Sequence, residues 1–314
     1  MKQRALKPWH GVVFFVIVMA IFFLIGVPIQ TYLGIYGVAV TELMLLILAL
    51  IFVKVMGYSW KTLLPVQKPR AFALLGTILI WIGAYLIDLV VMLIQYRLFP
   101  IQTNAVNAGL NDVIYSVPFL ISVVIVSILP AICEEAVHRG VIIHTLYTIR
   151  KEWLVVLIMG IYFGLFHTDP IRFLPTAILG AAISYIMLET ENIVYASFFH
   201  FVNNFFPLLL QQLLSLFGSS NVTTNSSAVE VPIASIGLYM MFATITPFLL
   251  YLGHYLLHYK KGASRPFFPK EKRLKIILWI VIPTLVLLVV GWILMLFGIL
   301  FDPVFSEIMN SAGY

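Results

Sequence analysis

The sequence contains little cysteine and little charge, and each shortage excludes a class of protein. Cys133 is the only cysteine, so an intrachain disulfide and a cysteine-rich metal site are both excluded. Charged residues make up 10% of the 314 residues, whereas typical soluble domains hold about 25%. Hydrophobic residues make up 62%. These proportions indicate that water is not the main solvent of this chain.

Long hydrophobic runs recur along the whole sequence, and none of them has the pattern of a strand. A helix needs about 20 residues to cross a ~30 Å hydrocarbon core, and backbone polar groups in lipid must pair within their own segment. We therefore predict an all-α fold, a polytopic transmembrane helical bundle with about eight or nine spans. The first run is too long for a removable signal peptide and should remain as a span. The candidates are 11–30, 38–56, 71–95, 113–133 (continuing as helix to about 149), 152–167, 171–188, 192–217, 232–257 and 276–301.

The net charge of +6 comes from basic residues beside the hydrophobic runs, which indicates membrane topology rather than nucleic-acid binding. With nine alternating spans, one side receives Lys2, Arg4, Lys7, Lys54, Lys61, Lys68, Arg70, Arg150, Lys151 and the Lys260–Lys275 cluster. The other side receives Arg97 and Arg172. We predict that the N-terminus and the basic loops lie in the cytoplasm, and that Lys260–Lys275 lies on anionic lipid.

Two predicted spans carry isolated acidic residues, Glu42 and Asp88. A charge at the centre of a bilayer costs at least ~2.5 kcal/mol. Pairing between helices, or a place near the membrane surface, is the simpler explanation for both. The alternative is that they contribute to the polar site described next.

One hydrophobic run contains the segment Pro130–Gly140, in which two carboxylates and an arginine interrupt an apolar helix. Glu135 and Arg139 are four residues apart and share a helical face, so they can form an ion pair that lowers the cost of burying either charge. Glu134 points about 100° away from that face. It is therefore free to act as a general base on water.

Two further runs carry histidines at a matching depth. Glu134 and His167 lie equally far along the chain from the turn at Arg150–Lys151, so an antiparallel hairpin places both ~15 Å deep. His200 lies ~14 Å from the same side by the same helical rise, and Asn204 shares its helical face. Four polar groups at one depth favour a functional site over separate packing roles.

The three motifs Glu134-Glu135…Arg139, Phe163…His167 and His200…Asn204 resemble those of the CPBP family, the CaaX proteases and bacteriocin-processing (Abi-type) enzymes. Its eukaryotic members are the type II CaaX prenyl endopeptidases. The resemblance covers roughly residues 113–210. It implies an intramembrane endopeptidase with a catalytic core at 113–217, between N-terminal transmembrane helices at 1–112 and C-terminal ones at 218–314 with the basic connector.

The resemblance also implies roles for individual residues. Glu134 and His167 would activate the attacking water, while His200 and Asn204 would stabilise the oxyanion. Glu135 and Arg139 would position the first helix, and Phe163 would support the site. The substrate would be a membrane protein or a membrane-associated peptide.

Several alternatives stay open at this point. Glu134, His167 and His200 could hold a divalent metal such as zinc, or the site could work without a metal. A transporter also uses intramembrane charges, although no internal repeat is evident, and a scaffold could keep the fold without catalysis. Cys133 has no activating cation one helical turn away, which favours a packing role over a nucleophilic one.

The sequence contains no feature that identifies a prenyl-binding groove. A bacterial cell membrane is the expected location. In such a host, peptide-pheromone maturation, bacteriocin maturation or self-immunity would be the expected context.

Overall fold

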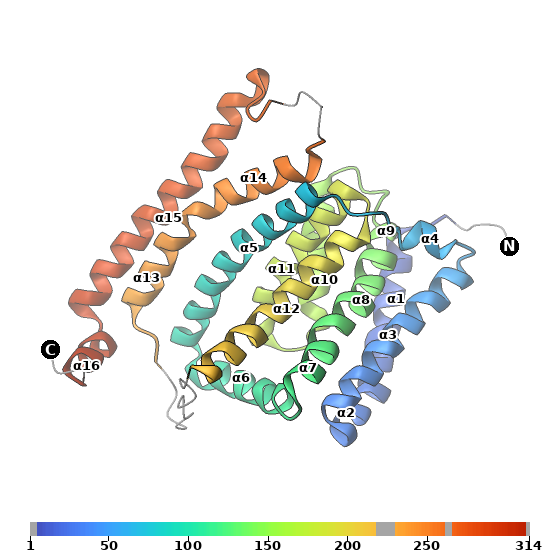
Figure 1. Ribbon diagram of the computed structural model, residues 1–314, viewed down its shortest axis with the longest axis horizontal. Coiled ribbons are helices and arrows are strands. Elements are labelled where there is room, and N and C mark those ends of the chain that lie inside the picture. Colours follow the sequence, from blue (N-terminus) through green and yellow to red (C-terminus); the bar gives the residue numbers. More distant parts are fainter. Residues whose placement is uncertain (1–4, 218–229, 261–265, 312–314) are drawn as a thin grey trace. The chain divides into compact units, whose positions relative to one another are not determined.

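A computed structural model describes residues 5–217, 230–260 and 266–311, and every regular element in these ranges is a helix (Figure 1). Within these described ranges, eight helices are long and apolar enough to cross a membrane. The prediction of a polytopic helical bundle is thereby confirmed. The eight are Pro8–Leu33, Ile35–Val55, Ala71–Leu98, Phe119–Thr145, Pro170–Thr190, Ile193–Leu216, Ile233–His258 and Lys270–Phe301.

The helices differ from the prediction in the length of one run, in the end of another and in two additional short helices. The run at 152–167 forms α10 (Glu152–Phe166), which at 15 residues is shorter than the eight long helices. The helix predicted to continue to about 149 ends with α9 (Ile143–Thr145). Two helices with polar sequences, α6 (Pro100–Ile114) and α16 (Pro303–Ser311), were not predicted, because neither forms an apolar run of membrane length. Residues 261–265 of the basic connector lie outside the described ranges.

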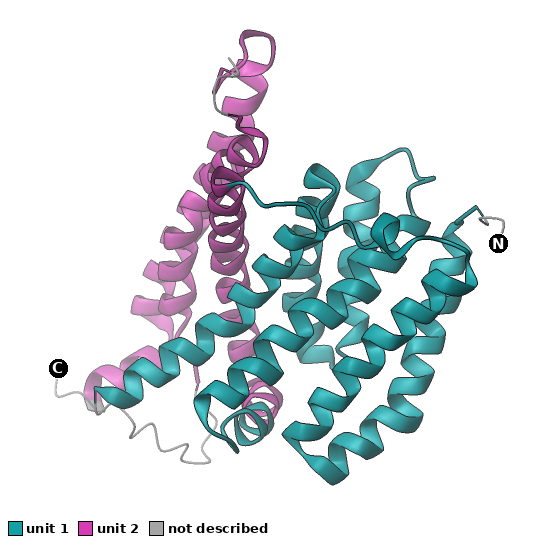
Figure 2. Ribbon diagram, turned by 45° about the vertical axis from the view of Figure 1, so that its right-hand side comes forward, with its two compact units in different colours: residues 1–70, 108–224 teal, residues 71–107, 225–314 magenta. Residues whose placement is uncertain are grey.

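The chain divides into two compact units (Figure 2), of which unit 1 comprises residues 1–70 and 108–224. Within unit 1, α3 packs against α8, α10 pairs with α11, and α12 contacts both α8 and α11. Its elements are α1 (Pro8–Ile21), η1 (Phe22–Gly26), α2 (Val27–Leu33), α3 (Ile35–Val55), α4 (Trp60–Leu63), α7 (Phe119–Ser122), η2 (Val123–Ile128), α8 (Leu129–Glu135), η3 (Ala136–Ile142), α9, α10, α11 (Pro170–Thr190) and α12 (Ile193–Leu216).

The span that carries the first motif is not a regular α-helix. A π-helical segment, η2, precedes α8, and another, η3, follows it. Each π turn widens the helix, and such segments occur often at functional sites. Glu134 and Glu135 are the last two residues of the short α-helical piece between them.

Unit 2 comprises residues 71–107 and 225–314. Its helix α5 (Ala71–Leu98) packs against α14 (Thr246–His258), and α13 (Ile233–Phe242) packs against α15 (Arg273–Phe301). A Cβ atom at Gly76 of α5 would lie 2.6 Å from the carbonyl oxygen of Gly253 on α14, so a small residue is required for this close helix contact.

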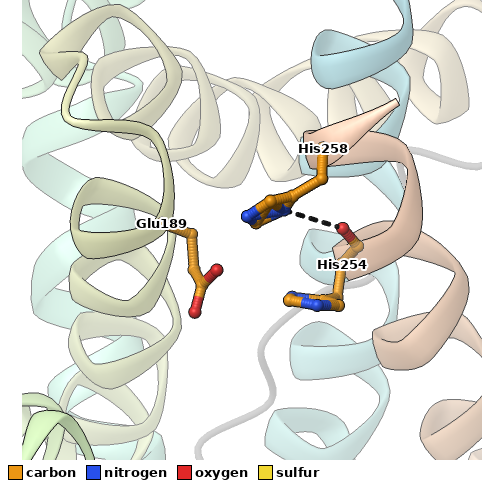
Figure 3. A group of neighbouring side chains, drawn as sticks. All are labelled: Glu189, His254 and His258. Atoms are coloured by element: carbon orange, nitrogen blue, oxygen red, sulfur yellow. Dashed lines mark hydrogen bonds between the residues drawn. The ribbon is translucent and has the colours of Figure 1, made fainter. Parts of the chain in front are cut away.

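His254 and His258 lie one turn apart on α14 (Figure 3), with their ring centroids 4.7 Å apart. Nδ1 of His258 lies 3.3 Å from the carbonyl oxygen of His254.

The division of the sequence at 1–112, 113–217 and 218–314 stays a prediction.

Candidate active site

The Glu135 carboxylate joins the first motif to the third. Its Oε1 atom accepts a hydrogen bond of 2.9 Å from Arg139 and lies 2.8 Å from Nδ1 of His200. The side chains of Glu135 and Arg139 are completely buried. This is the ion pair that the i,i+4 spacing predicts, and it extends to a histidine on another helix. The carboxylate therefore fixes the orientation of the His200 ring.

The Arg139 guanidinium contacts residues of several helices in unit 1. Nε donates to the Ser184 hydroxyl at 3.1 Å, and one terminal nitrogen donates to the Gly180 carbonyl oxygen at 2.6 Å. The guanidinium also lies 4.7 Å from the centroid of the Phe163 ring, a cation–π arrangement. These contacts bind α11 and α10 to η3. Arg139 thus connects these helices, and its completely buried side chain is not accessible to a substrate.

Phe163 connects the two histidines of the predicted site. Its ring centroid lies 4.9 Å from that of His167 and 5.6 Å from that of His200, in edge-on contacts. Gly180 leaves the space that this ring occupies, because a Cβ atom there would lie 2.5 Å from Cβ of Phe163. The supporting role predicted for Phe163 has a physical basis in this packing.

A cavity of about 380 Å³ inside unit 1 brings the four predicted catalytic side chains together. Glu134, His167, His200 and Asn204 all line it. The Glu134 side chain is buried, and its Oε2 atom has no hydrogen-bond partner among the described residues. A carboxylate oxygen in this state can accept a proton from water. The same cavity is lined by Glu42 and Arg172, and by an apolar portion with Phe22, Leu45, Leu110 and Val126.

The position of His167 fixes which of its nitrogens can act as a base. Nδ1 lies 2.8 Å from the carbonyl oxygen of Phe163. A carbonyl oxygen only accepts hydrogen bonds, so Nδ1 carries the proton and Nε2 presents its lone pair. His167 is the C-cap residue directly after α10, and Thr168 follows it with φ +57°. That backbone conformation is rare for a β-branched residue and marks a strained turn at the site.

His200 and Asn204 lie on one face of α12, as predicted, and both are oriented by hydrogen bonds. Nδ1 of His200 lies 2.8 Å from the Glu135 carboxylate, so Nε2 is the ring nitrogen left for a ligand. The Asn204 amide donates to the Val126 carbonyl oxygen at 3.0 Å, and its own oxygen accepts from Asn203 at 3.3 Å. Because an amide nitrogen has two donors, one N–H of Asn204 remains for a ligand.

Several residues of this arrangement were not predicted as part of the site. Arg172 was considered only as a marker of topology, although it lines the cavity. His138 is buried, and its Nδ1 lies 2.9 Å from the Glu134 carbonyl oxygen. Ser184 and Gly180 are partners of Arg139. Only His138 had a signal in the sequence, because it is a polar residue inside the motif helix.

The predicted metal ligands do not form a ready-made metal site. Among the described residues, the ligand atoms of Glu134, His167 and His200 do not all lie within 4.8 Å of one another. Nδ1 of each histidine already bonds to a protein oxygen, which leaves Nε2 as the single available atom on each ring. A zinc ion binds nitrogen and oxygen ligands at about 2.0–2.2 Å. The three side chains would therefore have to move to share one ion.

Residues 116–206 match a family model described as type II CAAX prenyl endopeptidase Rce1-like. The matched segment contains all three motifs and most of the cavity's polar side chains. The resemblance predicted from the motifs is confirmed over this segment. No solved structure matches the chain.

Two curated relatives are similar at low identity. "Putative membrane peptidase YdiL" of Bacillus subtilis is 29% identical over 119 residues, which cover 38% of this chain and 48% of the relative. "UPF0177 protein YxdF" of Lactococcus lactis is 27% identical over 178 residues, which cover 55% of this chain and 97% of the relative. The chain thus spans about half the length of the first relative. The family model and the first name support a membrane protease.

Proposed function

We propose that the chain is an intramembrane endopeptidase in which Glu134 activates water to hydrolyse a peptide bond. The observation that carries the proposal is the cavity in unit 1, which is lined by both the Glu134 carboxylate and the His167 ring. Glu134 has an oxygen without a hydrogen-bond partner in the described part of the chain, and His167 has a free Nε2 lone pair. Two proton acceptors lining one cavity are suited to binding and deprotonating a water molecule.

In this mechanism the water oxygen attacks the carbonyl carbon of the scissile peptide bond while its proton moves to Glu134. His167 Nε2 accepts a hydrogen bond from the same water and orients it. The bond that forms is carbon–oxygen, and the product is a tetrahedral intermediate with a negative oxygen. No covalent bond to the protein is made.

The developing oxyanion receives hydrogen bonds from Nε2–H of His200 and from the second N–H of Asn204. The ion pair of Glu135 and Arg139 keeps the His200 ring in place. When the carbon–nitrogen bond breaks, the proton held by Glu134 moves to the leaving amine. The products are an amine and a carboxylic acid, which passes its remaining proton to the amine or to solvent, and Glu134 returns to its ionised form.

The substrate in this proposal is a membrane protein or membrane-associated peptide whose scissile segment enters the cavity from the bilayer or the cytoplasmic side. We also propose that the protein resides in a bacterial cell membrane with its N-terminus in the cytoplasm. The proposal includes no metal ion, because the predicted ligands would have to move to hold one. Prenylated CaaX substrates and bacteriocin or pheromone precursors are the two classes to test first.

The test uses the full chain in lipid nanodiscs with a pool of internally quenched peptides that carry hydrophobic anchors, including a farnesylated CaaX peptide. We expect cleavage by the wild type. Glu134→Gln should lower kcat about 10²–10⁴-fold because a general base is lost. Asn204→Ala should lower it about 10²–10³-fold because one oxyanion donor is lost.

Asp88→Asn provides the matched control, because Asp88 is a buried acidic residue of a membrane-spanning helix that does not line the cavity. It should cleave at the wild-type rate. Wild-type activity in Glu134→Gln would refute the proposal. Solute flux in proteoliposomes that depends on Glu134, without peptide cleavage, would favour a transporter. An unchanged cellular phenotype in Glu134→Gln and His167→Ala would favour a scaffold.

A further inference from the structure

A second buried carboxyl group, Glu42 of α3, lies in the cavity of Glu134. Glu42 is 6% exposed and Glu134 is 8% exposed. Both line the same cavity, and α3 packs directly against α8. Glu42 lies outside residues 116–206, so the match to the family model assigns no role to it.

The two carboxyl groups line one cavity of about 380 Å³ on helices that pack directly on each other, and a charge on either group disfavours a charge on the other. Each group also has one oxygen, Oε2, without a partner among the described residues. Two ionised carboxylates in contact inside an apolar environment repel strongly, whereas a pair that shares one proton forms a short, charge-assisted hydrogen bond. The pair therefore requires at least one proton.

The polar neighbours of Glu42 on its own hairpin are engaged elsewhere. The Thr41 hydroxyl donates to the Val38 carbonyl oxygen at 2.9 Å and accepts from Gln30 at 2.8 Å. No cation forms a salt bridge with Glu42 in the described part of the chain. A charge on Glu42 would be uncompensated and costly in a membrane span, which favours the protonated form of Glu42.

We propose that Glu42 is a positioning residue that donates this proton in a hydrogen bond to the Glu134 carboxylate. The hydrogen bond holds one oxygen of Glu134 and leaves the other oriented toward the attacking water. Glu134 thereby remains ionised, as a general base must be, while the buried pair carries a single negative charge. The proposal deepens the mechanism described above and rests on it, because a positioned Glu134 matters only if that residue acts on water.

The kinetic test compares two substitutions at Glu42 in lipid nanodiscs with the anchored, internally quenched peptide pool. Glu42→Ala removes the donor and should lower kcat up to about 10²-fold, the cost of a small misplacement of a reacting group, with KM unchanged. Glu42→Gln keeps an N–H donor of nearly the same length and should restore most of the rate. Asp88→Asn is the control. Equal losses in Glu42→Ala and Glu42→Gln, or no loss in either, would overturn the proposal.

A second measurement needs no substrate. We expect the infrared difference spectrum of wild type minus Glu42→Gln, at neutral pH, to contain the carbonyl band of a protonated carboxyl group. The band should shift when the same difference is recorded in a Glu134→Ala background, because the hydrogen bond is lost. Carboxylate bands in place of the carbonyl band would show that Glu42 is ionised and would overturn the proposal. If the wild type cleaves no peptide but these bands appear, the proposed function fails while the shared proton stands.

Discussion

At the scale of single residues, the packing of Phe163 depends on the absence of a side chain at Gly180. A Cβ atom there would lie 2.5 Å from Cβ of Phe163, so Gly180→Ala must displace the ring that contacts His167 and His200. We expect lower thermal stability and a loss of peptide cleavage, since overpacking typically costs about 1–3 kcal/mol.

Gly109→Ala is the matched control for this substitution, because it also changes a helical glycine of unit 1 but has open space around it. It should leave cleavage unchanged and slightly raise stability through the higher helix propensity of alanine. Thermal unfolding in detergent, followed by tryptophan fluorescence, measures the stability of both variants. The assay with quenched peptides measures their cleavage rates. Equal stability of the two variants would contradict the packing argument.

Glu135 neutralises a buried arginine. We therefore expect its replacement to lower the stability of the protein in addition to any effect on the cleavage rate. Glu135→Gln leaves the Arg139 guanidinium without its carboxylate at a completely buried position. Breaking a buried ion pair in this way typically costs about 3–5 kcal/mol. Arg139→Lys should also destabilise, because an ammonium group cannot reproduce the separate bonds to Glu135, Ser184 and Gly180.

The measurement is the midpoint of thermal unfolding for both variants in one detergent. A stable Glu135→Gln protein with wild-type unfolding would show that the pair does not hold the helices together. In that case the effect of Glu135 would be confined to the orientation of His200.

The contacts of Glu135 and Glu42 illustrate which parts of the site the sequence could predict. The pairing of Glu135 with Arg139 follows from their spacing on one helix. Glu42 lies far from Glu134 in sequence, and only the packing of α3 on α8 brings the two together. Glu42 stands out as an acidic residue in an apolar span, but no neighbouring residue in the sequence indicates its partner. The hydrogen bonds of Arg139 to Gly180 and Ser184 likewise cannot be predicted from the sequence, because neither partner is charged.

At the scale of elements, the turn between α10 and α11 places His167 at the cavity. Thr168 adopts φ +57°, and Asp169 caps α11 by accepting from the backbone N–H groups of Ile171 and Arg172. Loss of such a cap typically costs about 1 kcal/mol. We expect Asp169→Ala to loosen this turn and to lower kcat by weakening the placement of His167, while Thr168→Gly, which suits the positive φ, keeps activity.

The comparison of these two variants needs cleavage rates and unfolding midpoints for both. Full activity in Asp169→Ala would show that the turn does not control the position of His167. The π-helical segments beside α8 could not be predicted from sequence in the same way, because the low helix propensity of the valines, isoleucines and glycine in η2 and η3 does not distinguish a π-helical turn from an α-helical one.

At the scale of the whole molecule, the bundle was predicted because its apolar runs have membrane length, whereas the two compact units were not. Unit 1 is assembled from residues 1–70 and 108–224, and unit 2 from 71–107 and 225–314. The chain passes between the two units three times, so the division is set by helix packing and has no marker in composition.

The sidedness of the molecule is testable because Cys133 is the only cysteine and is buried. We replace it by alanine and introduce single cysteines at Lys68 or at Arg97. A membrane-impermeant maleimide applied to intact cells should label the Arg97 position and not the Lys68 position, because the basic loops are predicted to be cytoplasmic. The reverse pattern would show that the orientation is inverted.

The most direct test of the central claim is cleavage in ¹⁸O-labelled water by the wild type and by Glu134→Gln in the same nanodiscs. If Glu134 activates water, mass spectrometry will find ¹⁸O in the new C-terminal carboxylate of the wild-type product. Glu134→Gln should then lose about 10²-fold or more of the rate. Labelled product formed by Glu134→Gln at the wild-type rate would contradict the claim.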